Sequence, residues 1–122
     1  MPRYESGTFD PPAPVMRARV TGPGHLTQAD VPLLLDTGAD ISIIPIAVAQ
    51  NVEAKIEDGR VPVSYLGGEV ATYDQARLTV EFGRYRFQGA FLLANVAYGV
   101  IGRNILNLLT VTFDGPGLTW SA

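Results

Sequence analysis

Residues 33–40 carry the sequence Leu-Leu-Leu-Asp-Thr-Gly-Ala-Asp, and this stretch decides how the chain is interpreted. The three leucines predict a buried strand, and Asp36 follows at its end, where an unpaired charge is costly to desolvate. Burial raises the pKa of a carboxyl group, and a second carboxylate beside it raises one of the two further. Two such groups supply one acid and one base, as peptide-bond hydrolysis requires. The simpler interpretation is a turn that Asp36 caps, with Thr37 bonded to backbone and Gly38 supplying a positive φ.

Composition narrows the classes of protein that remain. The chain has 122 residues, enough for one domain, and its 13 glycines and 9 prolines favour short strands joined by turns over long helices. Hydrophobic residues make up 47% and charged residues 17%, which excludes wholesale disorder. The absence of cysteine excludes disulfides and thiol catalysis, and the single histidine, His25, cannot build a multi-histidine metal site. We therefore expect any chemistry to come from carboxylates, hydroxyls or backbone, with no metal.

Charge and hydropathy also bear on partners and location. The formal charge of −3 offers no field that would attract nucleic acid or an anionic membrane surface. No run of 18 apolar residues spans a membrane, and the N-terminus lacks the apolar core of a signal peptide. We expect a soluble cytoplasmic protein, although a processed fragment would look the same.

The rest of the chain predicts one all-β domain over residues 15–122, preceded by an extended or disordered arm over residues 1–14, which holds four prolines. Apolar runs and alternation predict strands at 15–20, 31–35, 41–44, 61–66, 70–73, 77–82, 84–87, 91–93, 110–113 and 118–120. Apolar residues at helical spacing predict a helix over 102–109, and a helical turn is expected at 46–50. The charged segment 51–60 is expected to be exposed.

Four motifs in this order resemble the retroviral-type aspartic proteases, the retropepsin family. They are Leu-Leu-Asp-Thr-Gly-Ala-Asp at 34–40, Tyr-Leu-Gly-Gly at 65–68, Tyr-Asp-Gln at 73–75 and Val-Ile-Gly-Arg-Asn-Ile-Leu at 100–106. The resemblance covers residues 15–113. It implies an all-β fold, a closed β-barrel of the acid-protease type with a flap hairpin and one short helix near the C-terminus.

The resemblance also implies roles for the residues around Asp36. Asp36 matches the catalytic aspartate, and one copy per chain implies a homodimer in which an Asp36 dyad activates water without any cofactor. Thr37 matches the residue that bonds across the dimer axis, and Gly38 matches the glycine that lets substrate backbone approach closely. Asp40 and Arg103 match an internal ion pair beneath the active site, and Asp40 also matches a position that receives substrate backbone.

The remaining implied residues belong to the substrate cleft. Tyr65, Leu66, Gly67 and Gly68 match the flap, a mobile lid over the cleft, with an ordinary exposed hairpin as the alternative. The expected apolar walls, each of which could instead pack in the core, are Leu34, Ala39, Ile43, Leu66 and Val100. The substrate implied is a peptide or protein in extended conformation, with apolar residues beside the scissile bond.

Two features depart from the retroviral pattern. Retroviral enzymes build much of their dimer interface from short interleaved chain termini. Here residues 110–120 predict a separate terminal hairpin, and the proline-rich arm shows no counterpart of the leading strand. These departures are more typical of a cellular or prokaryotic relative than of a viral polyprotein segment. The alternative functions are a non-catalytic peptide-binding or dimerisation module that retains the fold, and an unrelated small β-barrel that binds ligands.

Overall fold

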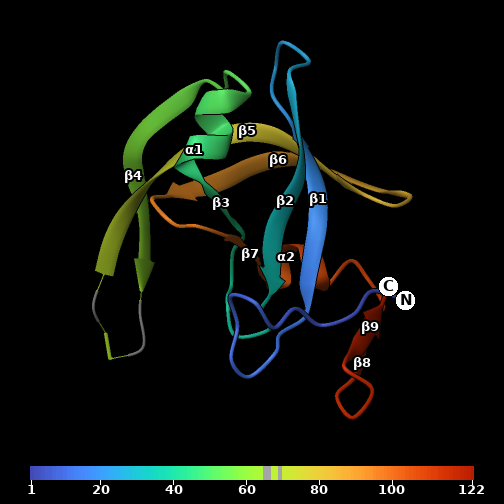
Figure 1. Cartoon of the computed structure of the whole chain (residues 1–122). Coiled ribbons are helices and arrows are strands. Elements are labelled where there is room, and N and C mark those ends of the chain that lie inside the picture. Colours follow the sequence, from blue (N-terminus) through green and yellow to red (C-terminus); the bar gives the residue numbers. More distant parts are fainter. Residues whose placement is uncertain (65–66, 69) are drawn as a thin grey trace.

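A computed structural model of the chain describes residues 1–64, 67–68 and 70–122, apart from the side chains of residues 58–60. The elements are β1 (Val15–Thr21), β2 (Thr27–Leu35), β3 (Ile43–Pro45), α1 (Ile46–Asn51), β4 (Ile56–Ser64), β5 (Val70–Phe82), β6 (Tyr85–Ala94), β7 (Gly99–Ile101), α2 (Arg103–Leu106), β8 (Thr112–Asp114) and β9 (Thr119–Ser121). They are labelled in Figure 1.

Six strands close into a barrel. Their order is β1-β2-β7-β3-β6-β5, and β5 pairs again with β1 to complete the ring, while β4 continues the sheet beyond β5. The β2–β7 and β3–β6 pairs are parallel and the other pairs around the ring are antiparallel. The predicted all-β closed barrel is therefore confirmed.

The core fills the barrel because apolar side chains alternate along its strands. In β5, Leu78 and Val80 are buried, while Arg77, which points to the opposite face of the strand, is exposed, as the alternation predicts. The largest fully buried side chains include Met16, Leu33, Ile44, Leu92, Ile101 and Trp120. Burial of each such side chain contributes about 1.5–3 kcal/mol relative to exposure, so this shared interior holds the strands in register.

The helices differ from the sequence prediction in length. The predicted helix at 102–109 is limited to the four residues of α2, because Leu108 and Leu109 donate to carbonyls three residues back and tighten the chain into turns. The helical turn expected at 46–50 forms as α1, which has six residues. Neither helix in the described part of the chain has the length and apolar character needed to cross a membrane.

The segment 51–60 was expected to be exposed, and that expectation is wrong for part of it. Val52 is fully buried in the core, and β4 begins at Ile56. The cause is a close approach to the β1–β2 turn, where a Cβ on Gly22 would lie 2.1 Å from the Val52 carbonyl oxygen. The charged residues of this segment do not reveal this tertiary contact in the sequence.

Both chain ends meet in one small sheet, which we call the terminal sheet: residues 2–4, β9 and β8. The Tyr4 N–H donates to the Leu118 carbonyl at 2.7 Å, and the Trp120 N–H donates to the Pro2 carbonyl at 3.0 Å. Trp120 stacks on Phe82 with ring centroids 5.3 Å apart, which packs this sheet against the barrel. N and C accordingly lie side by side in Figure 1. The boundary between residues 1–14 and a domain over 15–122 stays a prediction.

Candidate active site

The loop Asp36–Asp40 begins where β2 ends. Leu34 pairs with Val100 and Leu35 with Ile101 in the parallel β2–β7 ladder. The Asp36 N–H then donates to the Ile101 carbonyl at 3.0 Å, so the ladder holds the backbone of Asp36 in place. Asp36 is half-buried at this strand end, as the three leucines predict.

The carboxylate of Asp36 is positioned by its own loop. Its Oδ1 accepts a hydrogen bond from the Gly38 N–H at 2.8 Å, and the Ala39 N–H donates to the Asp36 carbonyl at 3.2 Å. A Cβ on Gly38 would lie 3.1 Å from the same Oδ1, while the φ of Gly38 lies outside the left-handed region. The idea that Gly38 supplies a positive φ is therefore wrong, and the glycine serves to leave space beside the carboxylate.

Helix α2 clamps the other end of the loop. The N–H groups of Arg103 and Asn104 donate to the carbonyls of Ala39 and Asp40, at 2.8 Å and 3.2 Å. The Arg103 side chain donates through Nη1 to the Thr37 carbonyl at 2.6 Å and through Nη2 to the Asp40 carboxylate. One guanidinium thus joins two points of the loop, which its planar fork of donors allows.

The Asp40–Arg103 ion pair forms as the resemblance implied, but its burial differs from the expectation. The resemblance implied an internal ion pair, but the side chain of Asp40 is 85% exposed and that of Arg103 is 43% exposed in the single chain. The pair lies on the surface because Asp40 stands at the outer end of the loop. Water screens such a pair, so its contribution lies in shaping the loop more than in charge attraction.

Sequence analysis missed a residue behind the loop. Ser42 is fully buried, and its Oγ donates to Asn104 Oδ1 at 2.8 Å while accepting the Gly102 N–H at 3.0 Å. These bonds join the approach to β3 with the start of α2. The available signal was one hydroxyl inside the apolar run 41–44, because a buried polar group needs partners.

A cleft of about 340 Å³ opens beside the Asp36 carboxylate. It is lined by Asp36, Gly38, Ala39, Asp40, Ile41, Ile43, Val63, Ser64, Tyr73 and Val100. The loop, β7, β4 and β5 therefore contribute to one site, although residues 40 and 100 are far apart in the sequence. Ile41, Val63, Ser64 and Tyr73 were not predicted as site residues. Ile41 directly follows the loop in the chain, whereas the other three come from β4 and β5 and reach the cleft only through the fold.

Other predicted site residues lie outside this lining. Thr37 is exposed on the loop, and Leu34 is half-buried within β2. Gly67 and Gly68 are exposed near the tip of the β4–β5 hairpin with φ values of 101° and 87°, which suit a glycine turn. Tyr65 and Leu66, predicted as flap residues, lie outside the described residues.

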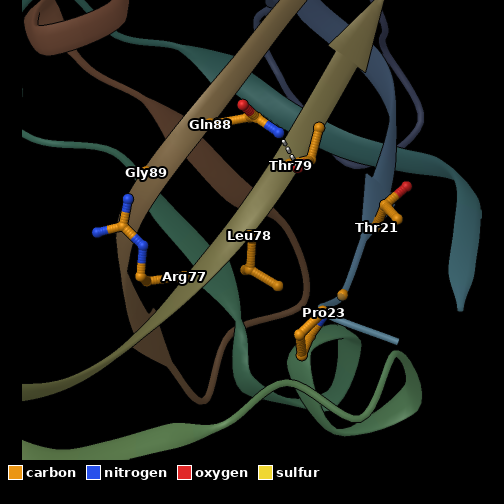
Figure 2. Close-up of a pocket in the computed structure, with 8 residues that line it drawn as sticks. Thr21, Pro23, Arg77, Leu78, Thr79, Gln88 and Gly89 are labelled. Carbon is orange, nitrogen blue, oxygen red and sulfur yellow. Dashed lines mark hydrogen bonds between the residues drawn. The ribbon is translucent and has the colours of Figure 1, made fainter. Parts of the chain in front are cut away.

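A second hollow of about 370 Å³ lies at the far end of the β1–β2 pair, where the chain passes from Thr21 to Pro23 (Figure 2). Its polar side chains include Thr79, Gln88 and Arg77, and Gln88 is 3.5 Å from the Thr79 hydroxyl. The register places it away from Asp36, because Thr21 pairs with Thr27 whereas Val15 pairs with Leu34. Among the residues that the structure describes, its lining includes no carboxylate.

Comparison with known proteins agrees with this geometry. A family model described as aspartyl protease matches residues 16–113, which is most of the chain. The chain belongs to the aspartyl protease family. Among solved structures it resembles the EIAV protease in complex with the inhibitor HBY-793, with a TM-score of 0.58 and 20% sequence identity over 78% of this chain and 86% of that one.

This family membership excludes the alternative interpretation of the chain as an unrelated small β-barrel that binds ligands. The likeness to the EIAV protease establishes the retropepsin-like fold of this aspartyl protease family member. Both findings fit a loop that starts at the end of β2 and lines a cleft with Asp36.

Proposed function

We propose that the chain is an aspartic endopeptidase whose active site is completed by a second copy of the same chain. The observation that carries this proposal is the half-buried Asp36 carboxylate, fixed by its loop at the wall of a cleft. The Asp-Thr-Gly sequence occurs once per chain, so two such carboxylates require two chains. A twofold axis places the same loop of each copy face to face.

The dyad supplies both proton-transfer roles. Aspartic proteases hold two carboxylates about 3 Å apart that share one proton. The ionised Asp36 takes a proton from water as the water oxygen attacks the scissile carbonyl carbon, and the protonated Asp36 donates a hydrogen bond to the carbonyl oxygen. As the tetrahedral intermediate collapses, the C–N bond breaks and the leaving nitrogen receives a proton from the dyad.

The cleft favours apolar side chains in an extended peptide. Ile41, Ile43, Val63 and Val100 provide apolar lining, and the β4–β5 hairpin contributes Val63, Ser64 and Tyr73. In this proposal the hairpin acts as a flap over the bound peptide. An extended substrate gains strand-like hydrogen bonds between hairpin and loop.

The test compares wild-type protein with Asp36→Asn on a mixed peptide library. We expect hydrolysis by the wild type, inhibition by a statine-type compound, and loss of turnover in Asp36→Asn, because the amide cannot act as a base. Asp10→Asn, at an exposed position of the arm, is the matched control and should retain activity.

Turnover retained by purified Asp36→Asn would contradict the proposal. A wild-type protein that binds the inhibitor and peptides without cleaving them would instead establish the alternative, a non-catalytic peptide-binding module.

A further inference from the structure

The β5–β6 hairpin has one strand edge that the barrel leaves unpaired. β6 pairs with β5 over Tyr85–Leu93, but β3 covers only its last residues, from Leu92 to Ala94. Among the residues that the structure describes, no strand lies beside Tyr85–Ala90 on the side away from β5. The hairpin projects past β1 in Figure 1. An exposed strand edge of this kind is a template on which another extended chain pairs.

The backbone groups that this edge offers follow from the hairpin turn. Phe82 pairs with Tyr85 across the two-residue turn Gly83–Arg84, and residues that flank such a turn hydrogen-bond to each other. Hydrogen-bonded and non-hydrogen-bonded pairs then alternate along the two strands, whose register has no shift. The Leu92 N–H, which donates to the Ser42 carbonyl at 3.3 Å on the β3 side, follows the same alternation. The N–H and C=O groups that point away from β5 are therefore those of Arg86, Gln88 and Ala90.

A cavity of about 320 Å³ lies along the same edge. β6 contributes Arg86–Phe91 to its lining, and α2 with the turn after it contributes Asn104, Ile105 and Leu108. Leu108 is 70% exposed, whereas Ile105 is buried. Side chains alternate between the two faces of a strand, so a strand added to β6 would place every second side chain over this cavity. Apolar side chains there would cover Leu108.

The edge carries positive charge, although the chain as a whole has a formal charge of −3. Arg84 and Arg86 are both exposed, and residues 83–94 include no acidic residue. Glu81 lies opposite Arg86 in the register, but in the described part of the chain no ion pair joins the two. Arg86 therefore keeps its charge available to a ligand, and the charge that complements this edge is negative.

The same charges argue against a second copy of β6 as the occupant. Pairing of two such edges would gather Arg84 and Arg86 of both copies in one short ladder, and like charges on neighbouring strands are destabilising. Charged side chains on edge strands prevent self-pairing in this way. An acidic strand meets the opposite condition, because its carboxylates face the arginines.

We propose that the free edge of β6 is a docking site for an extended acidic segment of a partner protein, which adds to the sheet beside Tyr85–Ala90. The segment alternates apolar residues, which cover Leu108 in the cavity, with acidic or polar residues, which face Arg86. As the structure describes them, the linings of this cavity and of the Asp36 cleft have no residue in common. The docking site therefore does not depend on the proposed function.

Fluorescence anisotropy with the labelled peptide Glu-Val-Thr-Val-Glu-Val-Thr tests this site, with a saturating statine-type inhibitor present to occupy the catalytic cleft. We expect saturable binding that weakens as salt is added, because exposed charges are screened. The same peptide with Lys in place of each Glu should not bind. A version methylated on its backbone nitrogens should also fail, because it has no N–H groups to donate to the edge.

Two variants place the peptide on β6. Arg86→Glu should weaken binding about two- to tenfold through charge repulsion, and Leu108→Ser should weaken it about three- to tenfold through loss of apolar contact. Lys55→Glu and Leu26→Ser make the same changes at exposed positions elsewhere and should bind like the wild type. Since all four positions are exposed, thermal unfolding midpoints should stay close to that of the wild type.

The docking site is overturned if the acidic peptide does not bind, if the inhibitor displaces it, or if Arg86→Glu and Leu108→Ser bind it as tightly as their controls. Self-association of the wild type that displaces the peptide would assign the edge to a second copy and also overturn the proposal. Hydrolysis of short peptides separates this test from the proposed function. Peptide binding at β6 without hydrolysis supports the docking site and refutes the endopeptidase, whereas hydrolysis without this binding does the reverse.

Discussion

The Asp36 carboxylate and the Gly38 backbone act as one unit at the scale of single residues. The Gly38 N–H fixes Oδ1 at 2.8 Å, and the missing side chain of Gly38 keeps the space beside that oxygen open. Any Cβ there must displace either the carboxylate or the loop. Asp36 therefore depends on its neighbour two residues on for its orientation.

Gly38→Ala should reduce kcat/KM by about 10- to 100-fold, since small displacements of a reacting group have effects of this size. Peptide hydrolysis measures the loss, and thermal unfolding should show a much smaller change. Gly115→Ala is the control, because an added Cβ there meets nothing within 4 Å. Equal activity of the two variants would show that the space beside Oδ1 is not needed.

Individual residues were predictable from the sequence where a motif carries them. Asp36, Gly38 and Arg103 lie together in the structure as the motifs imply. Ser42 was missed because a lone serine in an apolar run shows no partner until Asn104 is brought to it. The exposure of Asp40 was also missed, since a motif indicates which residues form an ion pair but not how deeply that pair is buried.

At the scale of elements, Ser42 links β3 to α2. Replacing it with alanine leaves the Gly102 N–H without its partner, and a buried unsatisfied donor costs about 1–3 kcal/mol. Ser42→Ala should lower the free energy of unfolding by that amount in urea denaturation, whereas Ser6→Ala, at an exposed site on the arm, should change it little. A loss in Ser42→Ala no larger than in the control would contradict this role.

Besides its pairing with β9, the N-terminal arm contacts β1 through a hydrogen-bonded ion pair between Glu5 and Arg17. Arg17 donates to both carboxylate oxygens of Glu5, at 2.8 Å and 2.6 Å, and these hydrogen bonds hold the pKa of Glu5 below its ordinary value of 4.5. A lowered pKa in the folded state stabilises the fold above the ordinary pKa. That stabilisation is lost as the pH falls through the folded-state pKa.

Glu5→Gln should therefore destabilise the protein by up to about 1 kcal/mol well above pH 4.5, the usual limit for an exposed pair. The difference from wild type should shrink as the pH falls below this value. Urea unfolding at several pH values measures it, with Glu53→Gln as an exposed control. A difference that grows toward low pH would have the wrong sign for this pair.

Elements with clear alternation, such as β5 and β6, were predictable because one face of each is buried and the other is not. Helix lengths and the start of β4 were not, because a turn at Leu108 and the burial of Val52 depend on contacts made elsewhere in the fold. Local pattern predicts that an element exists more readily than it predicts where the element ends.

At the scale of the whole molecule, the proposed site shared by two chains would make activity depend on which subunits associate. If equal amounts of wild-type and Asp36→Asn protein exchange subunits at random, about one quarter of the dimers carry aspartate at position 36 in both chains. Activity per total protein should then fall to about one quarter. Each mixture is assayed after equilibration, and a fall to only one half would indicate that each chain acts alone.

The barrel topology could not be predicted from local patterns. The parallel pairs β2–β7 and β3–β6 join segments that lie far apart in the chain, and no turn signal specifies them. The resemblance of residues 34–40 and 100–106 to one family supplied this information, because those two motifs belong to the strands and loops that meet at the cleft.

The adjacent chain ends have a practical consequence for protein engineering. Since the Trp120 N–H donates to the Pro2 carbonyl, a short linker could join Ala122 to Met1 with little rearrangement. New ends could then be opened at the exposed Gly83–Arg84 turn. Such a circular permutant would keep the Asp36 loop intact and leave the original ends unavailable to exopeptidases.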